Sequence, residues 1–244
     1  MTAALDLRLT ALDLSARIVA IRRAVKGRLV FTTSFGLEDQ ALAHAIAATG
    51  VEAEFVTLDT GRLFPETLAL WALTEQRLNI RVQAFTPDAA ATELLLKTQG
   101  VDGFYRSIDA RKACCEVRKV IPLGRALDGA AGWITGLRAD QSAARGAIPF
   151  AEQDARYTLA KFNPLADWSR DAVMDYVETH DVPVNPLHAQ GFASIGCAPC
   201  SRAIRPGEPE RAGRWWWEDE DKKECGLHVG PDGRLRRVEA GAPA

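Results

Sequence analysis

The chain has 244 residues, 47% of them hydrophobic and 25% charged, and its 30 Lys and Arg against 32 Asp and Glu give a net charge of −2. This is the composition of a globular protein, and it excludes collagen-like, disulfide-dense and intrinsically disordered chains. The charge gives no general attraction to nucleic acid or to membranes, and no apolar run approaches the roughly 20 residues that span a bilayer. Because the N-terminus also lacks the layout of a signal peptide, we expect a cytoplasmic protein with no nucleic-acid or membrane partner.

In chain order, the hydrophobic pattern predicts helices that alternate with strands. Leu14, Ile18, Ile21 and Val25 recur at helical spacing before Gly27. The further predicted helices are 38–49, 64–78, 89–97, 117–127 with an interruption at Pro122, and 168–180. The predicted strands are 28–34, 53–60, 80–86, 131–136 and the run TLAKFNPL at 158–165. This alternation indicates an α/β fold with a mostly parallel, doubly wound sheet.

Three of the predicted strands are followed by polar loops that contain glycine. These loops are SFGLED from Ser34, LDTGRLFPE from Leu58 and GLRADQSAAR from Gly136. Doubly wound sheets bind ligands beyond the carboxyl ends of their strands, so the three loops predict a site on one rim. The SFGLED turn opens a helix, where backbone N–H groups favour an anion. Asp59 could instead cap the helix that begins near Phe64.

The composition changes near the C-terminus. From about Pro183, Gly, Pro, Arg and Trp dominate and the periodicity is lost. We therefore expect an α/β domain over residues 1–202 and an irregular, mobile tail over residues 203–244.

The cysteines suggest a metal centre and a separate thiol. In a reducing cytoplasm all five should remain thiols. Cys114 and Cys115, with Cys197 and Cys200, supply enough thiolates for an iron–sulfur cluster or a tetrahedral zinc. Adjacent side chains normally point apart, so binding one ion with the first pair requires a strained backbone, which favours the larger cluster. Zinc remains open, and simple burial of four grouped cysteines is disfavoured. Cys225 stands alone, with basic and acidic neighbours that oppose each other in setting its thiolate fraction.

An ordered set of motifs adds a resemblance to a known family. CCEVRKV, CAPC and ECGLH occur together with SFGLEDQAL, LDTGRLFPET, GLRADQS, NPLADWS and RAIRPGEPERAGRWWWE. In these motifs the chain resembles the adenylyl-sulfate (APS) reductases of bacterial sulfate assimilation, within the PAPS reductase family, where PAPS is 3′-phosphorylated APS. The resemblance implies a sheet of the adenine-nucleotide alpha-hydrolase (PP-loop-like) type. It also implies one 4Fe–4S cluster per chain, ligated by Cys114, Cys115, Cys197 and Cys200. PAPS reductases usually lack these four cysteines, so APS is the expected substrate.

The resemblance also implies the reaction, which serves cysteine biosynthesis. The tail's Cys225 is the expected nucleophile, which attacks the sulfur of APS, releases AMP and becomes an S-sulfocysteine. Thioredoxin then releases sulfite, and Lys119 and His228 are expected to assist. The substrate-binding residues that the resemblance implies are Ser34, Phe35, Gly36, Glu38, Leu58, Asp59, Thr60, Gly61, Arg138, Arg145, Arg211 and Arg214. Family members also lead us to expect a homo-oligomer.

Two alternatives to this reading remain at this stage. Within the class, the chain could reduce PAPS, or both APS and PAPS. Outside it, the chain could be a zinc-stabilised nucleotide-binding module without catalysis. A nucleotide-dependent tRNA-modifying enzyme of the same fold is disfavoured by the SFGLED loop and by the net charge of −2.

Overall fold

A six-stranded sheet forms the centre of the molecule in the computed structural model, which describes residues 2–141 and 148–219. The strands are β1 (Leu29–Thr33), β2 (Glu54–Leu58), β3 (Val82–Phe85), β4 (Gly132–Ile134), β5 (Ala151–Asp154) and β6 (Leu159–Phe162). Their order is β3-β2-β1-β4-β6-β5, and only β5 runs antiparallel to its neighbour. The predicted mostly parallel α/β sheet is confirmed.

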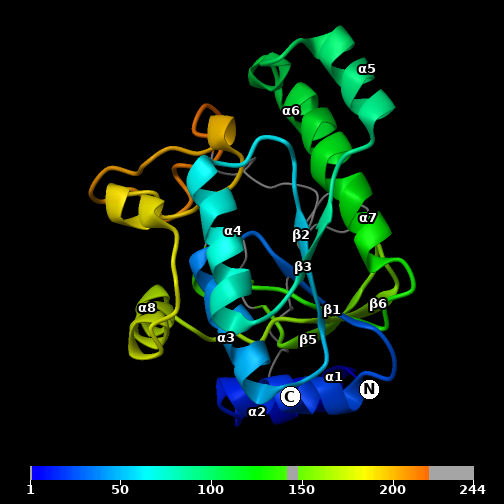
Figure 1. Cartoon of the computed structure of the whole chain (residues 1–244), viewed down its shortest axis with the longest axis vertical. Helices are drawn as coiled ribbons and strands as arrows, with labels where there is room; N and C mark the ends of the chain where they lie inside the picture. Colours follow the sequence, from blue (N-terminus) through cyan, green and yellow to red (C-terminus); the bar gives the residue numbers. More distant parts are fainter. Residues whose placement is uncertain (1, 142–147, 220–244) are drawn as a thin grey trace, which may run out of the picture.

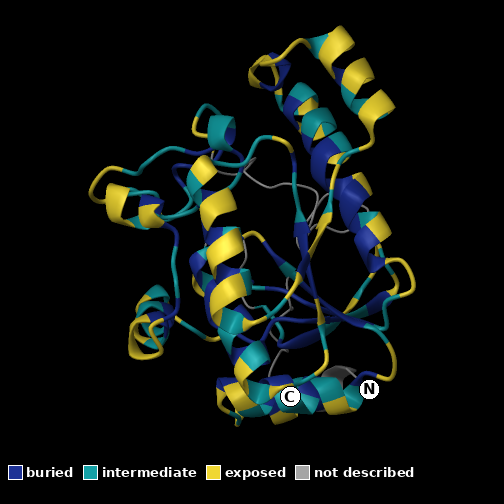
Figure 2. Cartoon of the chain, viewed as in Figure 1, coloured by how far each residue is buried: buried dark blue, intermediate teal, exposed yellow. Residues whose placement is uncertain are grey.

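Helices cover both faces of this sheet (Figure 1). Along β1, Leu29 and Phe31 belong to one core with α1 to α4, while Val30 packs with Leu123 of α7 in a second core. Alternate side chains of a strand point to opposite faces, so both faces of this central strand are buried (Figure 2). The helices are α1 (Thr2–Thr10), α2 (Leu14–Ala24), α3 (Leu37–Thr49), α4 (Pro65–Leu78), α5 (Ala89–Gln99), α6 (Ile108–Cys115), α7 (Ile121–Leu127) and α8 (Arg170–Thr179). No helix among the described residues is long and apolar enough to cross a bilayer.

Three elements were absent from the sequence prediction. In α6, the residues that face inward are Arg111 and Cys115, so the helix has no apolar stripe to detect. Strand β5 has the polar sequence AEQD and lies at the edge of the sheet. Helix α1 buries Leu5 and Leu9, at a spacing of four residues, and two apolar positions are too few to predict a helix.

The predicted interruption at Pro122 is wrong. The chain stays helical from α6 through the π-helical turn Glu116–Val120 into α7, and Pro122 lies in the first turn of α7. A π turn shifts the backbone hydrogen bonds by one residue, and proline lacks an N–H to donate. Proline is therefore tolerated where one helical segment passes into the next.

Residues 203–219 lie within the described part of the chain and contain turns without a helix or strand. Trp215 is 1% exposed, and Ser201 forms a β-bridge with Arg214. Arg111 of α6 donates to Glu218, with 2.8 Å between Nη2 and Oε2. These contacts pack residues 203–219 against the domain. Residues 220–244, and with them most of the predicted tail, lie outside the described residues.

Candidate functional site

A cavity of about 220 Å³ lies at the carboxyl ends of the central strands. Thr32 and Ser34 reach it from β1 and its loop, Thr57 from β2 and Thr135 from the end of β4. Strands β1 and β4 are neighbours where the chain order of the sheet reverses, and such a switch point is where doubly wound folds bind ligands. The cavity lies where the three glycine-containing loops were expected to meet.

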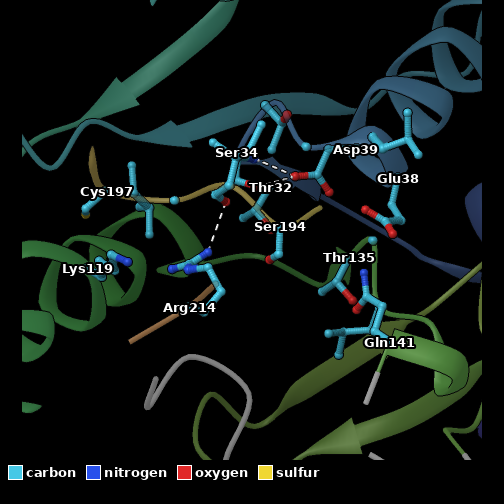
Figure 3. A pocket seen from close by; sticks show the side chains of 18 of the residues that line it. Thr32, Ser34, Glu38, Asp39, Lys119, Thr135, Gln141, Ser194, Cys197 and Arg214 are labelled. Carbon is cyan, nitrogen blue, oxygen red and sulfur yellow. Dashed lines mark hydrogen bonds between the residues drawn. The ribbon is translucent and has the colours of Figure 1, made fainter. Parts of the chain in front are cut away.

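The two sides of the cavity differ in charge. Lys119, Arg214 and Cys197 lie together on one side in Figure 3, and Glu38 and Gln141 lie on the other. Arg211 also lines the cavity. The guanidinium of Arg214 donates to the carbonyl oxygen of Ile195 at 3.0 Å, which fixes its direction. A ligand with an anionic end and a polar, uncharged end would match this asymmetry.

The turn after β1 contributes a carboxylate to the cavity wall. The backbone N of Ser34 donates to Asp39 at 2.6 Å, and the Ser34 hydroxyl donates to the same oxygen at 2.7 Å. Burial raises the pKa of Asp39 to about 6, against the opposing effect of these hydrogen bonds. Gly36 also lines the cavity, whereas Phe35 is buried behind it at a φ of 57° and stacks on Trp71 at 5.8 Å. Phe35 therefore supports the turn from the core.

Arg138 does not reach the cavity, although it was expected to bind substrate. Its side chain is fully buried between two carboxylates that do line the cavity. The Nε atom donates to Glu38 at 2.8 Å, and Nη2 donates to Glu210 at 2.9 Å. Arg138 thus neutralises the acidic wall and holds it in place.

The loop after β2 also differs in part from expectation. Leu58 and Thr60 line the cavity, but Asp59 and Gly61 do not belong to its lining. The Asp59 side chain accepts from the N–H of Gly61 at 2.9 Å, where the backbone has a φ of 67°. This local turn replaces the alternative role of Asp59 as a helix cap, because the cap residue of α4 is Phe64.

The four paired cysteines surround a second, smaller cavity. Cys114, Cys115, Cys197 and Cys200 line it together with four basic side chains, those of Arg62, Arg111, Arg118 and Lys119. Within residues 2–141 and 148–219, no group of three or more His, Cys, Asp and Glu side chains is placed to hold a single metal ion.

The backbone at the first pair has ordinary helical geometry. Cys115 has a φ of −65° and a ψ of −37°. The strain that a single ion would require of adjacent cysteines is not present at this residue. Cys197 is buried, which raises its pKa, but Lys119, a hydrogen bond with Thr60 and Arg214 together bring the pKa below its ordinary value. The surroundings of Cys197 thus favour a thiolate, the form that binds metals.

Lys119 lines both cavities. It is buried in the π-helical turn that follows the first cysteine pair. One cationic side chain therefore lies between the thiols and the larger cavity. By contrast, Cys225, His228 and Arg145 fall outside the described residues, and their expected roles stay predictions.

The cavity is also lined by residues that were not predicted to belong to the site. They include Thr32, Thr135, His188, Ser194 and Glu210. Thr32 and Thr135 lie within predicted strands, near their carboxyl ends, and Ser194 lies in the stretch for which no element was predicted. His188 comes from a segment without periodicity, so only the folded chain brings it to the rim, whereas Glu210 lies within the quoted motif RAIRPGEPERAGRWWWE, next to Arg211.

Comparison with known proteins identifies close relatives. Residues 28–203 match the phosphoadenosine phosphosulfate reductase domain. The chain is 54% identical over 228 residues to adenosine 5′-phosphosulfate reductase of Agrobacterium fabrum, covering 93% of this chain and 87% of that protein. It is 53% identical over 226 residues to the protein of the same name from Sinorhizobium fredii, covering 93% and 90%. Phosphoadenylyl-sulfate reductase from Candida auris, solved as a phosphate complex, has the same fold, with a TM-score of 0.71, 24% identity and coverage of 83% of this chain and 96% of that one.

Proposed function

Because the chain belongs to the phosphoadenosine phosphosulfate reductase family, we propose that it reduces adenosine 5′-phosphosulfate to sulfite and AMP. The single observation that carries this proposal is the cavity at the switch point, whose cationic side adjoins the cysteine-lined cavity. The names of the relatives, which specify adenosine 5′-phosphosulfate, favour the substrate without the 3′-phosphate. The electron donor in this proposal is thioredoxin, the reaction takes place in the cytoplasm, and the chain assembles into a homo-oligomer.

The cationic side supports the binding of the phosphosulfate group. Lys119, Arg211 and Arg214 offer N–H donors to an anion, and charge-assisted hydrogen bonds are about twice as strong as neutral ones. As the bond between sulfur and the phosphate oxygen breaks, negative charge grows on the departing AMP. Fixed cations at that point stabilise the transition state more than the bound substrate, which is what accelerates a reaction.

Cys225 acts as the nucleophile in this proposal. Its thiolate attacks the sulfur of the substrate, the bond from sulfur to the phosphate oxygen breaks, and AMP leaves with the electron pair. A thioredoxin thiolate then attacks the sulfur of Cys225 and releases sulfite. The second thioredoxin thiol resolves the mixed disulfide, so the thioredoxin dithiol supplies both electrons. No electron has to pass through a metal centre.

The cysteine-lined cavity fits an iron–sulfur cluster. Four thiols with basic neighbours line one cavity, and four cysteine thiolates are the ligand set of a cubane cluster. Cys114, Cys115, Cys197 and Cys200 would hold the 4Fe–4S cluster, which when bound would supply negative charge beside Lys119 and tie α6 to the segment near Cys197. Lys119 then stands between two anions and orients the phosphosulfate.

The proposal is tested by an assay of sulfite release with reduced thioredoxin. We expect turnover with adenosine 5′-phosphosulfate and much slower turnover with the 3′-phosphorylated substrate. Faster turnover of the phosphorylated substrate would assign the other activity of the family. Absence of sulfite from both substrates, with AMP still bound, would favour a nucleotide-binding module.

A further inference from the structure

A histidine in the wall of the large cavity has one ring nitrogen without a partner in the described part of the chain. His188 belongs to the 3-10 turn Pro186–Gln190 and lines the cavity. Its Nδ1 lies 2.7 Å from the carbonyl oxygen of Phe192. Its Nε2 is buried and has no hydrogen-bond partner among the described residues. Buried polar atoms are nearly always paired, so an orphaned nitrogen in a ligand-sized cavity points to a ligand atom.

The hydrogen bond at Nδ1 decides what Nε2 can do. A carbonyl oxygen only accepts, so Nδ1 carries the proton and donates it to Phe192. Burial lowers the pKa of His188; Arg170 adds to this effect, while the bond to Phe192 and the charge of Glu38 oppose it. The ring is therefore neutral near pH 7, and its Nε2 accepts. The missing partner is an O–H or N–H donor.

The position of the anion determines which part of a nucleotide can supply that donor. Lys119 and Arg214 attract the phosphosulfate to their side of the cavity, opposite Glu38 and Gln141 (Figure 3). The nucleoside then extends toward the wall that contains Glu38, whose charge also reaches His188. The donors of a nucleoside are its ribose hydroxyls and the amino group of adenine.

We propose that Nε2 of His188 accepts a hydrogen bond from the nucleoside part of the bound nucleotide. His188 is then a binding residue that selects for a hydroxyl or amino group at that point. This inference rests on the proposed function, because it takes the ligand to be an adenine nucleotide.

Two substitutions separate this role from a structural one. The amide of His188→Asn can still donate to Phe192 but places nothing at the position of Nε2. The longer side chain of His188→Gln offers an amide oxygen near Nε2 and gives up the bond to Phe192. If His188 binds the nucleoside, the Asn variant weakens binding and the Gln variant retains it. If His188 only supports its own turn, the Asn variant retains AMP binding and the Gln variant weakens it. Gln190→Ala, an exposed change in the same turn, is the matched control.

The experiment measures the dissociation constant of AMP by calorimetry on the whole chain, which requires no turnover. We expect His188→Asn to bind AMP about 5- to 20-fold more weakly than the wild type, the range for one lost hydrogen bond in a buried site. The donor is identified with 2′-deoxy-AMP, 3′-deoxy-AMP and purine riboside 5′-monophosphate, which lacks the amino group. One of these should bind the wild type more weakly than AMP does, and His188→Asn should bind it and AMP equally.

Four results would overturn the inference. If His188→Asn binds AMP as tightly as the wild type, His188 does not bind the nucleoside. The same conclusion follows if His188→Asn discriminates between AMP and the analogues as strongly as the wild type does. Weak binding confined to His188→Gln, with a lowered melting temperature, assigns a structural role. A wild type that binds no AMP would overturn the proposed function as well, whereas the first three results leave that function intact.

Discussion

The hydroxyl of Thr60 lies 3.3 Å from the sulfur of Cys197. Thr60 belongs to the loop after β2 and lines the large cavity, and Cys197 lines both cavities. The backbone N of Ala198 also donates to the carbonyl oxygen of Arg62 at 2.8 Å. Two segments that are far apart in the sequence therefore join the larger cavity to the thiols, and a change in one is expected to affect the other.

Thr60→Val tests this connection. Valine keeps the shape of threonine but removes the hydrogen bond to Cys197, a loss of about 1 kcal/mol. We expect slower turnover by several fold and a shifted absorption spectrum of the proposed iron–sulfur cluster. Thr98→Val, which removes a helix-surface hydroxyl of α5, is the control and should change neither. An unchanged spectrum and rate in Thr60→Val would show that the contact has no influence on the thiols.

Lys119→Ala should reduce activity more than stability. Lys119 lines both cavities, so its charge acts on the substrate anion in the proposed reaction. We expect kcat/KM to fall about 100-fold or more, the range for removing one electrostatic contact of a transition state. Lys112→Ala, on the exposed side of α6, is the matched control. A loss of folding stability as severe as the loss of rate would make Lys119 a structural residue.

The cysteines should separate into two functional groups. Cys197→Ser removes a proposed cluster ligand, so we expect loss of iron, of colour and of activity together. Cys225→Ser removes the proposed nucleophile and should retain iron while losing activity. Iron and zinc content of anaerobically purified protein provides the measurement. Stoichiometric zinc in place of iron in the wild type would contradict the cluster assignment.

Two arginines should respond differently because the structure places them differently. Arg138 is buried between Glu38 and Glu210, so Arg138→Gln removes the cation paired with Glu38 and leaves Glu210 with Arg170 alone, and we expect destabilisation of about 3 to 5 kcal/mol. Arg211 lines the cavity, so Arg211→Gln should weaken substrate binding with little change in stability. Urea unfolding and KM, measured on both variants, distinguish the two roles. A normal stability for Arg138→Gln would contradict the assignment of Arg138 to the wall.

Asp39 should make the stability of the protein depend on pH. Its pKa of about 6 in the folded chain lies above the ordinary value of 3.8, so the folded state holds this proton more tightly than the unfolded chain. The resulting stabilisation is fully present below about pH 4 and is lost as the pH rises through about 6, by up to about 3 kcal/mol. The unfolding free energy of Asp39→Asn lacks this dependence. Urea titrations from pH 4.5 to 7.5 test it, and parallel profiles for the two proteins would contradict it.

Particular residues show how far the sequence could predict this molecule. Alternating apolar segments predicted the parallel sheet, and the loops at Ser34, Leu58 and Gly136 predicted where the cavity would lie. Segments whose inward-facing residues are polar escaped detection, as in α6, where Arg111 is buried against Glu218. A helical pattern cannot reveal a buried ion pair with a partner more than a hundred residues away.

Two residues that were expected to bind substrate, Arg138 and Phe35, do not line the cavity. Motifs mark Arg138 and Phe35 as members of the loops, but a motif does not say which way a side chain points. The side chain of Arg138 points inward because it forms ion pairs with Glu38 and Glu210. The ring of Phe35 points inward because it stacks on Trp71. His188 lies in a segment without periodicity, and only tertiary packing places its Nε2 beside the cavity with no partner in residues 2–141 and 148–219.

The central claim is that Cys225 takes up the sulfonate group of adenosine 5′-phosphosulfate. The most direct measurement is the intact mass of anaerobically purified protein after incubation with this substrate in the absence of thioredoxin. We predict one added sulfonate per chain, located on Cys225 by peptide mapping, absent from Cys225→Ser and removed by reduced thioredoxin. An unmodified mass under conditions in which the substrate is bound, or an adduct on another cysteine, would contradict the account.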